Sequence, residues 1–211
     1  MADFSIKPTA GTGNKLIIKD QAGGTVLETS NAGSTLSNTV LASTVTGHGG
    51  VLEYDHWRLS TAFDGSAAPI ASNLIQSTYS ASSPDRQWAG KIGTGMSQSS
   101  GVFTFPSTGY WEVSFQHSCE RNGDARYVFN QIFYTYNNST WVAVTKMGNS
   151  ISHASSSYTY SSSFSSALIK VDDVSNDKVR FHIDSADASV STGGDTGQSY
   201  TAMTFIKFGE V

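Results

Sequence analysis

Apolar and polar residues alternate along much of the chain with the period of two that is typical of β-strands. The clearest case is residues 178–184, where three apolar residues alternate with four polar ones: Val179, Phe181 and Ile183 against Lys178, Arg180, His182 and Asp184. One face of this segment should meet a core and the other should meet water. The pattern therefore predicts a strand in an outer sheet.

Similar runs, bounded by turn residues, recur along the chain. A first strand is expected within residues 53–63, before a long connection of small residues at 62–83. Further strands are expected near residues 88–92, 101–105, 110–119, 126–136, 140–147, 158–170, 178–184 and 200–208. Asn122-Gly123 predicts a hairpin, because this pair readily adopts the positive φ of a tight turn. Eight or so strands without a helical period predict an all-β protein, an antiparallel β-sandwich of the jelly-roll type.

Two of these strands carry large apolar residues on both faces. They are residues 126–136 and the last strand, YTAMTFIKF at 200–208. Such residues could be scattered surface aromatics, but the repeated pattern favours a second face buried in a homo-oligomer. We expect both strands in the inner sheet of the jelly roll, with a trimer interface at Tyr134, Tyr136, Tyr200, Ile206 and Phe208.

Residues 1–52 differ in amino-acid composition from the head expected at residues 53–211. KLIIKD and TVLET, joined by QAGG, predict a small hairpin. The segment has too few large apolar residues for a core of its own, so it is either a linker or a part that orders against a partner. Its apolar residues favour attachment to a partner surface through Leu16, Ile17, Ile18, Val26 and Leu27.

Composition narrows the classes of partner. Only 14% of residues are charged and the net charge is -4, so no basic field exists to hold nucleic acid or an anionic membrane. The apolar runs are far shorter than the ~20 residues of a membrane helix, so no membrane insertion is expected. Cys119 is the sole cysteine and MADFSIKPTAGTG is polar, which fits synthesis in a reducing cytoplasm.

The stretch FTFPSTGYWEVSF, residues 103–115, places Pro106 and Gly109 before a strongly alternating strand. Proline fixes φ and glycine supplies a turn conformation that other residues resist, which predicts a corner. Trp111, Val113 and Phe115 should then enter the core, with Tyr110, Glu112 and Ser114 on the opposite face.

This stretch resembles the strand signature of the trimeric jelly-roll heads of complement q and tumour necrosis factor type, and YTAMTFIKFGEV is similar to their closing strand on the threefold axis. Together with YDHWRLSTAFDGSAAPIASNL, AGKIGTGM and the KLIIKDQAGGTVLET segment, it resembles virion structural proteins of tailed phages of marine bacteria. The resemblance covers nearly the whole chain and implies a homotrimer on the virion surface, made in the bacterial host cytoplasm. Its N-terminal region would dock on capsid or tail proteins, as in a short fibre, a spike or a capsid decoration protein.

Few residues of the chain form a recognisable catalytic or metal-binding motif. No nucleophile elbow, HExxH, CxxC or P-loop motif occurs, and the five histidines are not at metal-ligand spacing, so neither catalytic residues nor a cofactor are expected. Asp172, Asp173 and Asp177 form a weak calcium candidate, against a polar turn built from residues that favour turns. Carboxylate pairs keep open a polysaccharide-active spike enzyme.

Loops rich in aromatic, serine and asparagine residues suit recognition of a host-surface glycan or protein. The candidates are Trp141, His153, Tyr158 and Tyr160, against ordinary solvated loops. The expected function is therefore that of a non-enzymatic phage virion protein, with a bacterial adhesion module as a further alternative.

Overall fold

The computed structural model describes residues 17–19, 21–23, 25–30, 33–36, 51–77, 90–154 and 157–211. It divides into two compact units, Met1–Gly49 and Gly50–Val211. All regular elements in the described residues are strands, and this part of the chain contains no helix long and apolar enough to cross a membrane. The attachment role of residues 1–52 stays a prediction.

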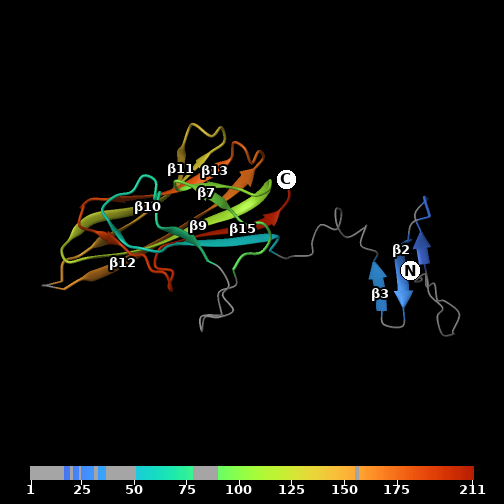
Figure 1. The fold of residues 1–211 in the computed structure, drawn as a ribbon, viewed down its shortest axis with the longest axis horizontal. Coiled ribbons are helices and arrows are strands. Elements are labelled where there is room, and N and C mark those ends of the chain that lie inside the picture. The colour runs from blue at the N-terminus through green and yellow to red at the C-terminus, as the bar shows by residue number, and fades with distance from the viewer. Residues whose placement is uncertain are drawn as a thin grey trace, which may run out of the picture. The chain divides into compact units, whose positions relative to one another are not determined.

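The first unit is a three-stranded antiparallel sheet of β1 (Ile17–Lys19), β2 (Thr25–Ser30) and β3 (Gly33–Leu36) (Figure 1). In its first hairpin Ile17 pairs with Glu28 and Ile18 with Leu27, as the sequence predicted. Gly23, in the turn, has a φ of 87°, a conformation that glycine adopts at no steric cost. Leu16 lies outside the described residues.

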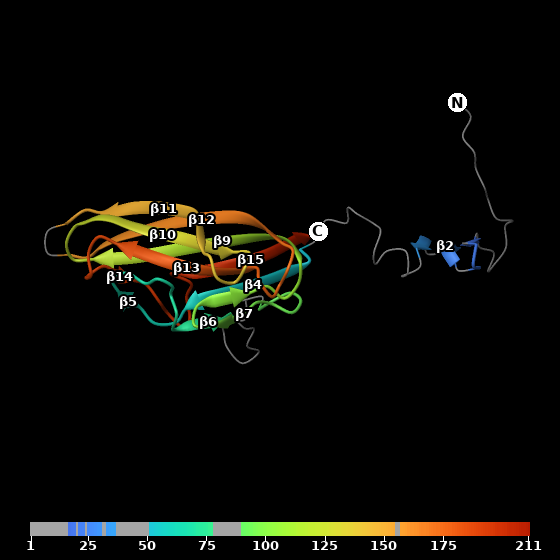
Figure 2. The same ribbon diagram turned by 90° about the horizontal axis from the view of Figure 1, so that it is seen from above.

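The head consists of two antiparallel sheets (Figures 1 and 2). The seven-stranded sheet contains β4 (Glu53–Leu59), β5 (Phe63–Asp64), β6 (Leu74–Gln76), β9 (Gly109–Arg121), β12 (Thr159–Val171), β14 (Ser191–Thr192) and β15 (Ala202–Gly209). The five-stranded sheet has the order β11 (Val142–Ile151), β10 (Ala125–Thr135), β13 (Lys178–Ser185), β8 (Val102–Thr104) and β7 (Ser97–Ser99).

Strand β9 is central to the seven-stranded sheet. It pairs with β12 along its whole length on one side, from Gly109 opposite Val171 to Arg121 opposite Thr159. On its other side it pairs with β15 and then with β14, and β15 continues the sheet to β4 and β6. Residues 109–115 of the stretch singled out from the sequence therefore lie in the middle of the seven-stranded sheet.

The core between the sheets is aromatic. Phe103 has its ring centroid 5.2 Å from that of Phe205 and 5.4 Å from that of Phe181, and Phe115 lies 5.1 Å from Phe181. Trp111, Val113 and Phe115 are completely buried, whereas Tyr110, Glu112 and Ser114 point to the other face with partial exposure. Both halves of the alternation predicted for this strand are confirmed.

The corner before β9 depends on Gly109, whose φ is 137°. A Cβ on this residue would collide with the carbonyl oxygen of Gly209 and with Cε of Lys207. The last strand thus crosses so close to the start of β9 that only glycine fits. Lys207 is buried beside this contact, and its Nζ donates to Ser107 Oγ at 3.0 Å and to Glu210 Oε1 at 2.9 Å.

The structure corrects how two of the predicted strands assemble. Strands β10 and β15 were expected in one sheet, but β10 pairs with β11 and β13 while β15 lies in the opposite sheet. Asn122-Gly123 does form a turn, with Gly123 at φ 145°, yet the strands on either side, β9 and β10, belong to different sheets. The turn is therefore a crossing between the layers, and the predicted hairpin is wrong.

Smaller corrections concern single residues and short strands. Val179, Phe181 and Ile183 enter the core from β13 as predicted, but His182, expected in water, is only 8% exposed because Phe133 stacks on it, with ring centroids 4.1 Å apart. The short strands β6, β7 and β14 were not predicted. Of the strand expected at residues 88–92 only the end is described, where Ile92 forms an isolated bridge with Tyr54.

Candidate functional site

The outward face of the seven-stranded sheet exposes a set of large apolar side chains. Cross-strand pairing places Leu168, Glu112 and Ile206 in one row and Phe164, Gln116 and Ala202 in another. The exposed members are Tyr110, Tyr160, Phe164, Leu168, Tyr200 and Phe208. We call these six residues the apolar face. Leu168 is 67% exposed and Phe164 is 57% exposed, so none of the described residues covers this face.

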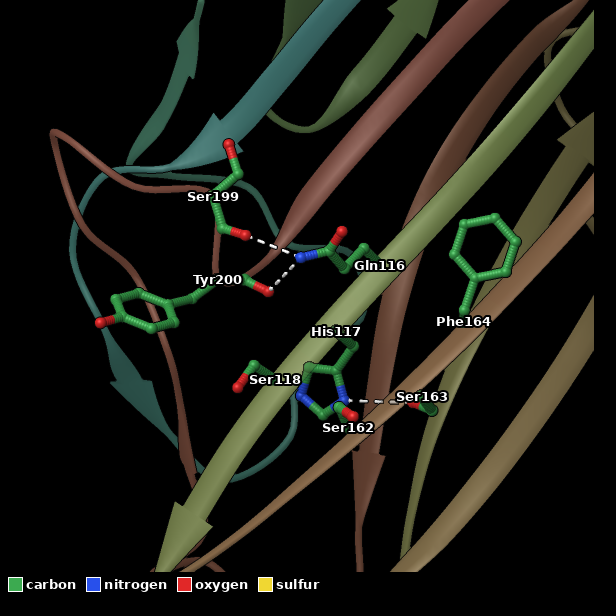
Figure 3. Close-up of a pocket in the computed structure, with 8 residues that line it drawn as sticks. All are labelled: Gln116, His117, Ser118, Ser162, Ser163, Phe164, Ser199 and Tyr200. Carbon is green, nitrogen blue, oxygen red and sulfur yellow. Dashed lines mark hydrogen bonds between the residues drawn. The ribbon is translucent and has the colours of Figure 1, made fainter. Parts of the chain in front are cut away.

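The apolar face contains a shallow hollow of about 490 Å³ between β9, β12 and the segment before β15. Figure 3 shows Phe164 and Tyr200 on either side of it, with Ser118, Ser162, Ser163 and His117 between them. Gln116 Nε2 donates to the carbonyl oxygen of Ser199 at 2.7 Å (Figure 3), which ties β9 to this segment. The hollow is apolar at its rims and polar in its floor.

His117 lies beneath that floor and is fully buried. Its Nε2 lies 3.3 Å from Thr192 Oγ1, and its Nδ1 lies 3.5 Å from Ser163 Oγ (Figure 3). Burial lowers the pKa of His117 to about 4. The imidazole is therefore neutral at physiological pH and serves as a hydrogen-bonding group of the core.

A second hollow of about 250 Å³ adjoins the first and shares Ser118 and Tyr200 with it. Tyr160, at its edge, is exposed on β12, and hydrogen bonding to Glu120 raises the pKa of its phenol. The two hollows make the apolar face uneven, a shape that suits a complementary protein surface better than a flat one.

The outward face of the five-stranded sheet is different, because its aromatic residues are covered within the chain. Phe129 stacks on Tyr127 with centroids 4.9 Å apart, and Lys146 Nζ lies 4.1 Å from the centre of the Phe129 ring. Phe133 is covered by His182. The apolar residues that the sequence showed on both faces of β10 are thus accounted for without a partner.

The predicted interface residues do not form one surface. Tyr134, on β10, points into the sandwich beside Ile132 and is partly buried, and its hydroxyl donates to Asp177 Oδ1 at 2.6 Å. Tyr136 follows β10 and is 64% exposed. Tyr200, Ile206 and Phe208 lie on the other sheet, on or beside the apolar face. The prediction failed for Tyr134 because parity along a strand does not tell which face is inward.

The three aspartates of the calcium candidate form a turn. Asp177 is 3% exposed, and its Oδ2 accepts hydrogen bonds of 2.7 Å from the backbone N–H groups of Asp172 and Asp173. Asp173 accepts from Ser175 N and Asn176 Nδ2, and these bonds lower its pKa. Asp172 pairs with Lys170 at 2.9 Å. Across the described residues no three His, Cys, Asp or Glu side chains are grouped to hold a metal.

The predicted receptor residues are dispersed. Trp141 is partly buried just before β11, whereas His153 and Tyr158 are exposed between β11 and β12. Tyr160 belongs to strand β12 and to the apolar face, so its placement in a loop is wrong. The attachment candidates Ile17, Ile18, Val26 and Leu27 lie on strands β1 and β2. Their contact with a partner protein stays a prediction.

Sequence reasoning missed Phe164 and Leu168, which are central to the apolar face. The signal was available, because residues 164–169 place these two side chains on one face of the strand and Ala167 and Ile169 on the other. A strand was expected at residues 158–170, but the serine-rich stretch up to Phe164 was interpreted as a recognition loop, and the outward apolar residues of the strand were not examined as a surface. Apolar residues on both faces of this serine-rich strand therefore indicated an outward apolar surface, which the sequence analysis did not use.

Solved structures of other proteins resemble the head in fold. No protein-family model matches the chain, and neither does any curated protein. Among solved structures the chain is similar to murine APRIL, with a TM-score of 0.50, 11% identity, and coverage of 74% of this chain and 98% of that one. It is also similar to the Eiger TNF of S. frugiperda, with a TM-score of 0.52, 13% identity, and coverage of 75% and 93%. The head is therefore a jelly roll of the tumour necrosis factor type, and the predicted all-β fold is confirmed.

Proposed function

We propose that the chain is a non-enzymatic structural protein of a tailed-phage virion, a homotrimer whose jelly-roll head is displayed on the particle surface. Residues 1–52 dock on other virion proteins. The protein then serves as a short fibre, a spike or a capsid decoration protein. Support for the virion comes from the sequence resemblance, which spans both parts of the chain.

The apolar face carries the proposal of self-association. It gathers six of the large exposed apolar side chains on neighbouring strands of one sheet. Full burial of an exposed side chain the size of Phe164 or Leu168 contributes roughly 1.5–3 kcal/mol, so a contact that covers several of them supplies a favourable free energy against the cost of association. Contiguous exposed apolar patches of this kind mark interaction sites.

A second copy of the chain is the occupant we assign to the apolar face. Closed symmetry lets a chain cover the same patch on every subunit, and the number three follows from the resemblance to trimeric heads. Glu112, partly exposed within the face, requires a polar or cationic group opposite it, since an unpaired buried carboxylate is costly. Association would also stabilise a chain without disulfides.

The state of assembly is measured by light scattering on the purified full chain at micromolar concentration. A trimer has three times the chain mass of 22.5 kDa, and a monomer overturns the proposal of self-association. The virion role is tested separately by electron microscopy of particles labelled with an antibody against residues 50–211. Label on the capsid or tail supports it, and unlabelled particles from cells that make the protein contradict it.

A further inference from the structure

Arg180 lies between two aromatic rings on the outward face of the five-stranded sheet. Its guanidinium carbon is 4.2 Å from the centre of the Trp141 ring and 5.6 Å from the centre of the Phe133 ring. Phe133 is its direct partner across strands β10 and β13. A guanidinium held against two rings keeps a fixed orientation, so its donors are arranged in advance for a ligand.

The cation of Arg180 has no anionic partner in the described part of the chain, where the only ion pair on this face joins Lys146 and Asp184 at 3.9 Å. Its Nε is buried without a hydrogen bond, and burial lowers the pKa of the guanidinium, which stays charged all the same. A partly dehydrated cation with unused donors is costly alone and favours a bound anion.

The surroundings of Arg180 add positive charge. Lys178 lies on the same face of β13, and its Nζ donates to Thr104 Oγ1 at 3.3 Å. Two of the three N–H donors of its ammonium group remain for a ligand. With Lys146 this face of the sheet carries three cations against the single carboxylate of Asp184, in a chain whose net charge is -4. The local charge is therefore opposite in sign to that of the whole protein.

We propose that Arg180, Trp141, Phe133 and Lys178 form a binding site for an acidic polysaccharide, with the carboxylate of a sugar acid on the guanidinium. A planar guanidinium matches a carboxylate through two parallel hydrogen bonds. Trp141, partly exposed beside the guanidinium, offers its ring for contact with the apolar face of a sugar ring. Phe133, covered by His182, serves to orient Arg180, and Lys178 lies two residues from Arg180 on the same face, where it can meet a further carboxylate along the chain of sugars.

This proposal adds an acidic polysaccharide as the ligand class of the displayed head, and it does not depend on trimer formation. It lies on the five-stranded sheet, whereas the apolar face lies on the seven-stranded sheet. Subunits that cover the apolar face therefore leave Arg180 accessible. A failure of either proposal leaves the other intact, because one is measured as mass and the other as carbohydrate binding.

The test uses oligomers of polygalacturonate and the same oligomers with every carboxylate methyl-esterified, titrated into the full-length protein by calorimetry. Binding of the acid form is expected, with at least about tenfold weaker binding of the ester, which corresponds to about 1.4 kcal/mol. Arg180→Gln should reduce affinity for the acid form about as much. Arg180→Lys should restore part of it, because the charge remains and the planar pair of donors is lost.

Arg126→Gln is the matched control, since Arg126 is an exposed arginine on the same strand as Phe133 and seven residues away from it. It removes the same charge and should change affinity by less than about twofold. Circular dichroism and thermal unfolding of each variant confirm that it is folded. Equal binding by Arg180→Gln and Arg126→Gln, or equal binding of acid and ester, overturns the site. Dextran sulfate bound equally by both variants would show nonspecific charge attraction and also overturn it.

Discussion

The hydroxyl of Tyr134 donates a 2.6 Å hydrogen bond to Oδ1 of Asp177. From the sequence, Tyr134 was expected in a subunit interface, and Asp177 was one of three residues of a weak candidate for a calcium site, weighed against a polar turn. The structure makes them partners, because the turn at residues 172–177 closes over the end of β10. Burial, followed by the bond to Asp177, raises the pKa of the Tyr134 phenol above its ordinary value.

Removal of this bond should destabilise the head without affecting assembly. Tyr134→Phe should lower the free energy of unfolding by about 1.5 kcal/mol, since a bond to a charged acceptor is lost. Asp177→Ala should cost about 3 kcal/mol, because the N–H groups of Asp172 and Asp173 also lose their acceptor. Denaturant unfolding of both single variants and the double variant measures the coupling.

Tyr136→Phe is the control, because Tyr136 is exposed and should tolerate loss of its hydroxyl. Calcium should leave the midpoint of unfolding unchanged in the unmodified protein. A rise of several degrees in the midpoint of thermal unfolding with millimolar calcium would support a metal site after all. Release of reducing sugar from host polysaccharide by the unmodified protein, but not by Asp177→Ala, would support the alternative of a polysaccharide-active enzyme.

The sequence predicted the individual strands well and their assembly less well. Alternation is a local property, so the inward set of Trp111, Val113 and Phe115 was readable from the residues alone. Sheet membership is decided by pairing between distant segments. A turn at Asn122-Gly123 has the same local chemistry whether the chain folds back in one sheet or crosses to the other.

The candidate surface was hard to predict for a related reason. Whether an outward apolar residue is covered depends on its neighbours across the sheet, as with Phe133 under His182 and Phe129 under Lys146. Phe164 and Leu168 have serines as near neighbours in the sequence, and no described residue covers them in this way. Covered and uncovered outward residues can be told apart only when the cross-strand pairs are known, and a single sequence does not specify these pairs.

Gly109 should be among the least replaceable residues of the head. Gly109→Ala places a Cβ against the carbonyl oxygen of Gly209 at a φ of 137°, and we expect a loss of about 3 kcal/mol in the free energy of unfolding. Gly209→Ala is a control from the same contact, because a Cβ there meets nothing within 4 Å. It should change stability by less than about 1 kcal/mol. Equal effects of the two variants in chemical denaturation would contradict the steric explanation.

Stability should decrease as the pH falls from about 6.5 to about 4. Burial lowers the pKa of His117 to about 4, and burial with nearby Arg180 lowers that of His182 to about 4. Between these limits the unfolded chain binds protons that the folded chain does not, so protonation favours unfolding. For His117 the difference of about 2.5 pH units corresponds to about 3 kcal/mol at most.

Unfolding in denaturant at pH 7, 5.5 and 4 measures this dependence. His117→Gln should flatten the profile, whereas His153→Gln should not, because water reaches the imidazole of His153 in both the folded and the unfolded states. A profile as steep in His117→Gln as in the unmodified protein would show that other groups control the acid sensitivity.

A charge on the apolar face should dissociate the assembly and leave the fold intact. Leu168 is 67% exposed in the single chain, so Leu168→Glu costs the monomer little, but in an oligomer it would bury an unpaired carboxylate at a cost of several kcal/mol. Light scattering should then report the mass of one chain, with an unchanged circular dichroism spectrum. Ser97→Glu adds the same charge at an exposed position of β7 in the opposite sheet and should leave the trimer intact. A trimer that survives Leu168→Glu and Phe164→Glu together would place the subunit contact elsewhere on the head.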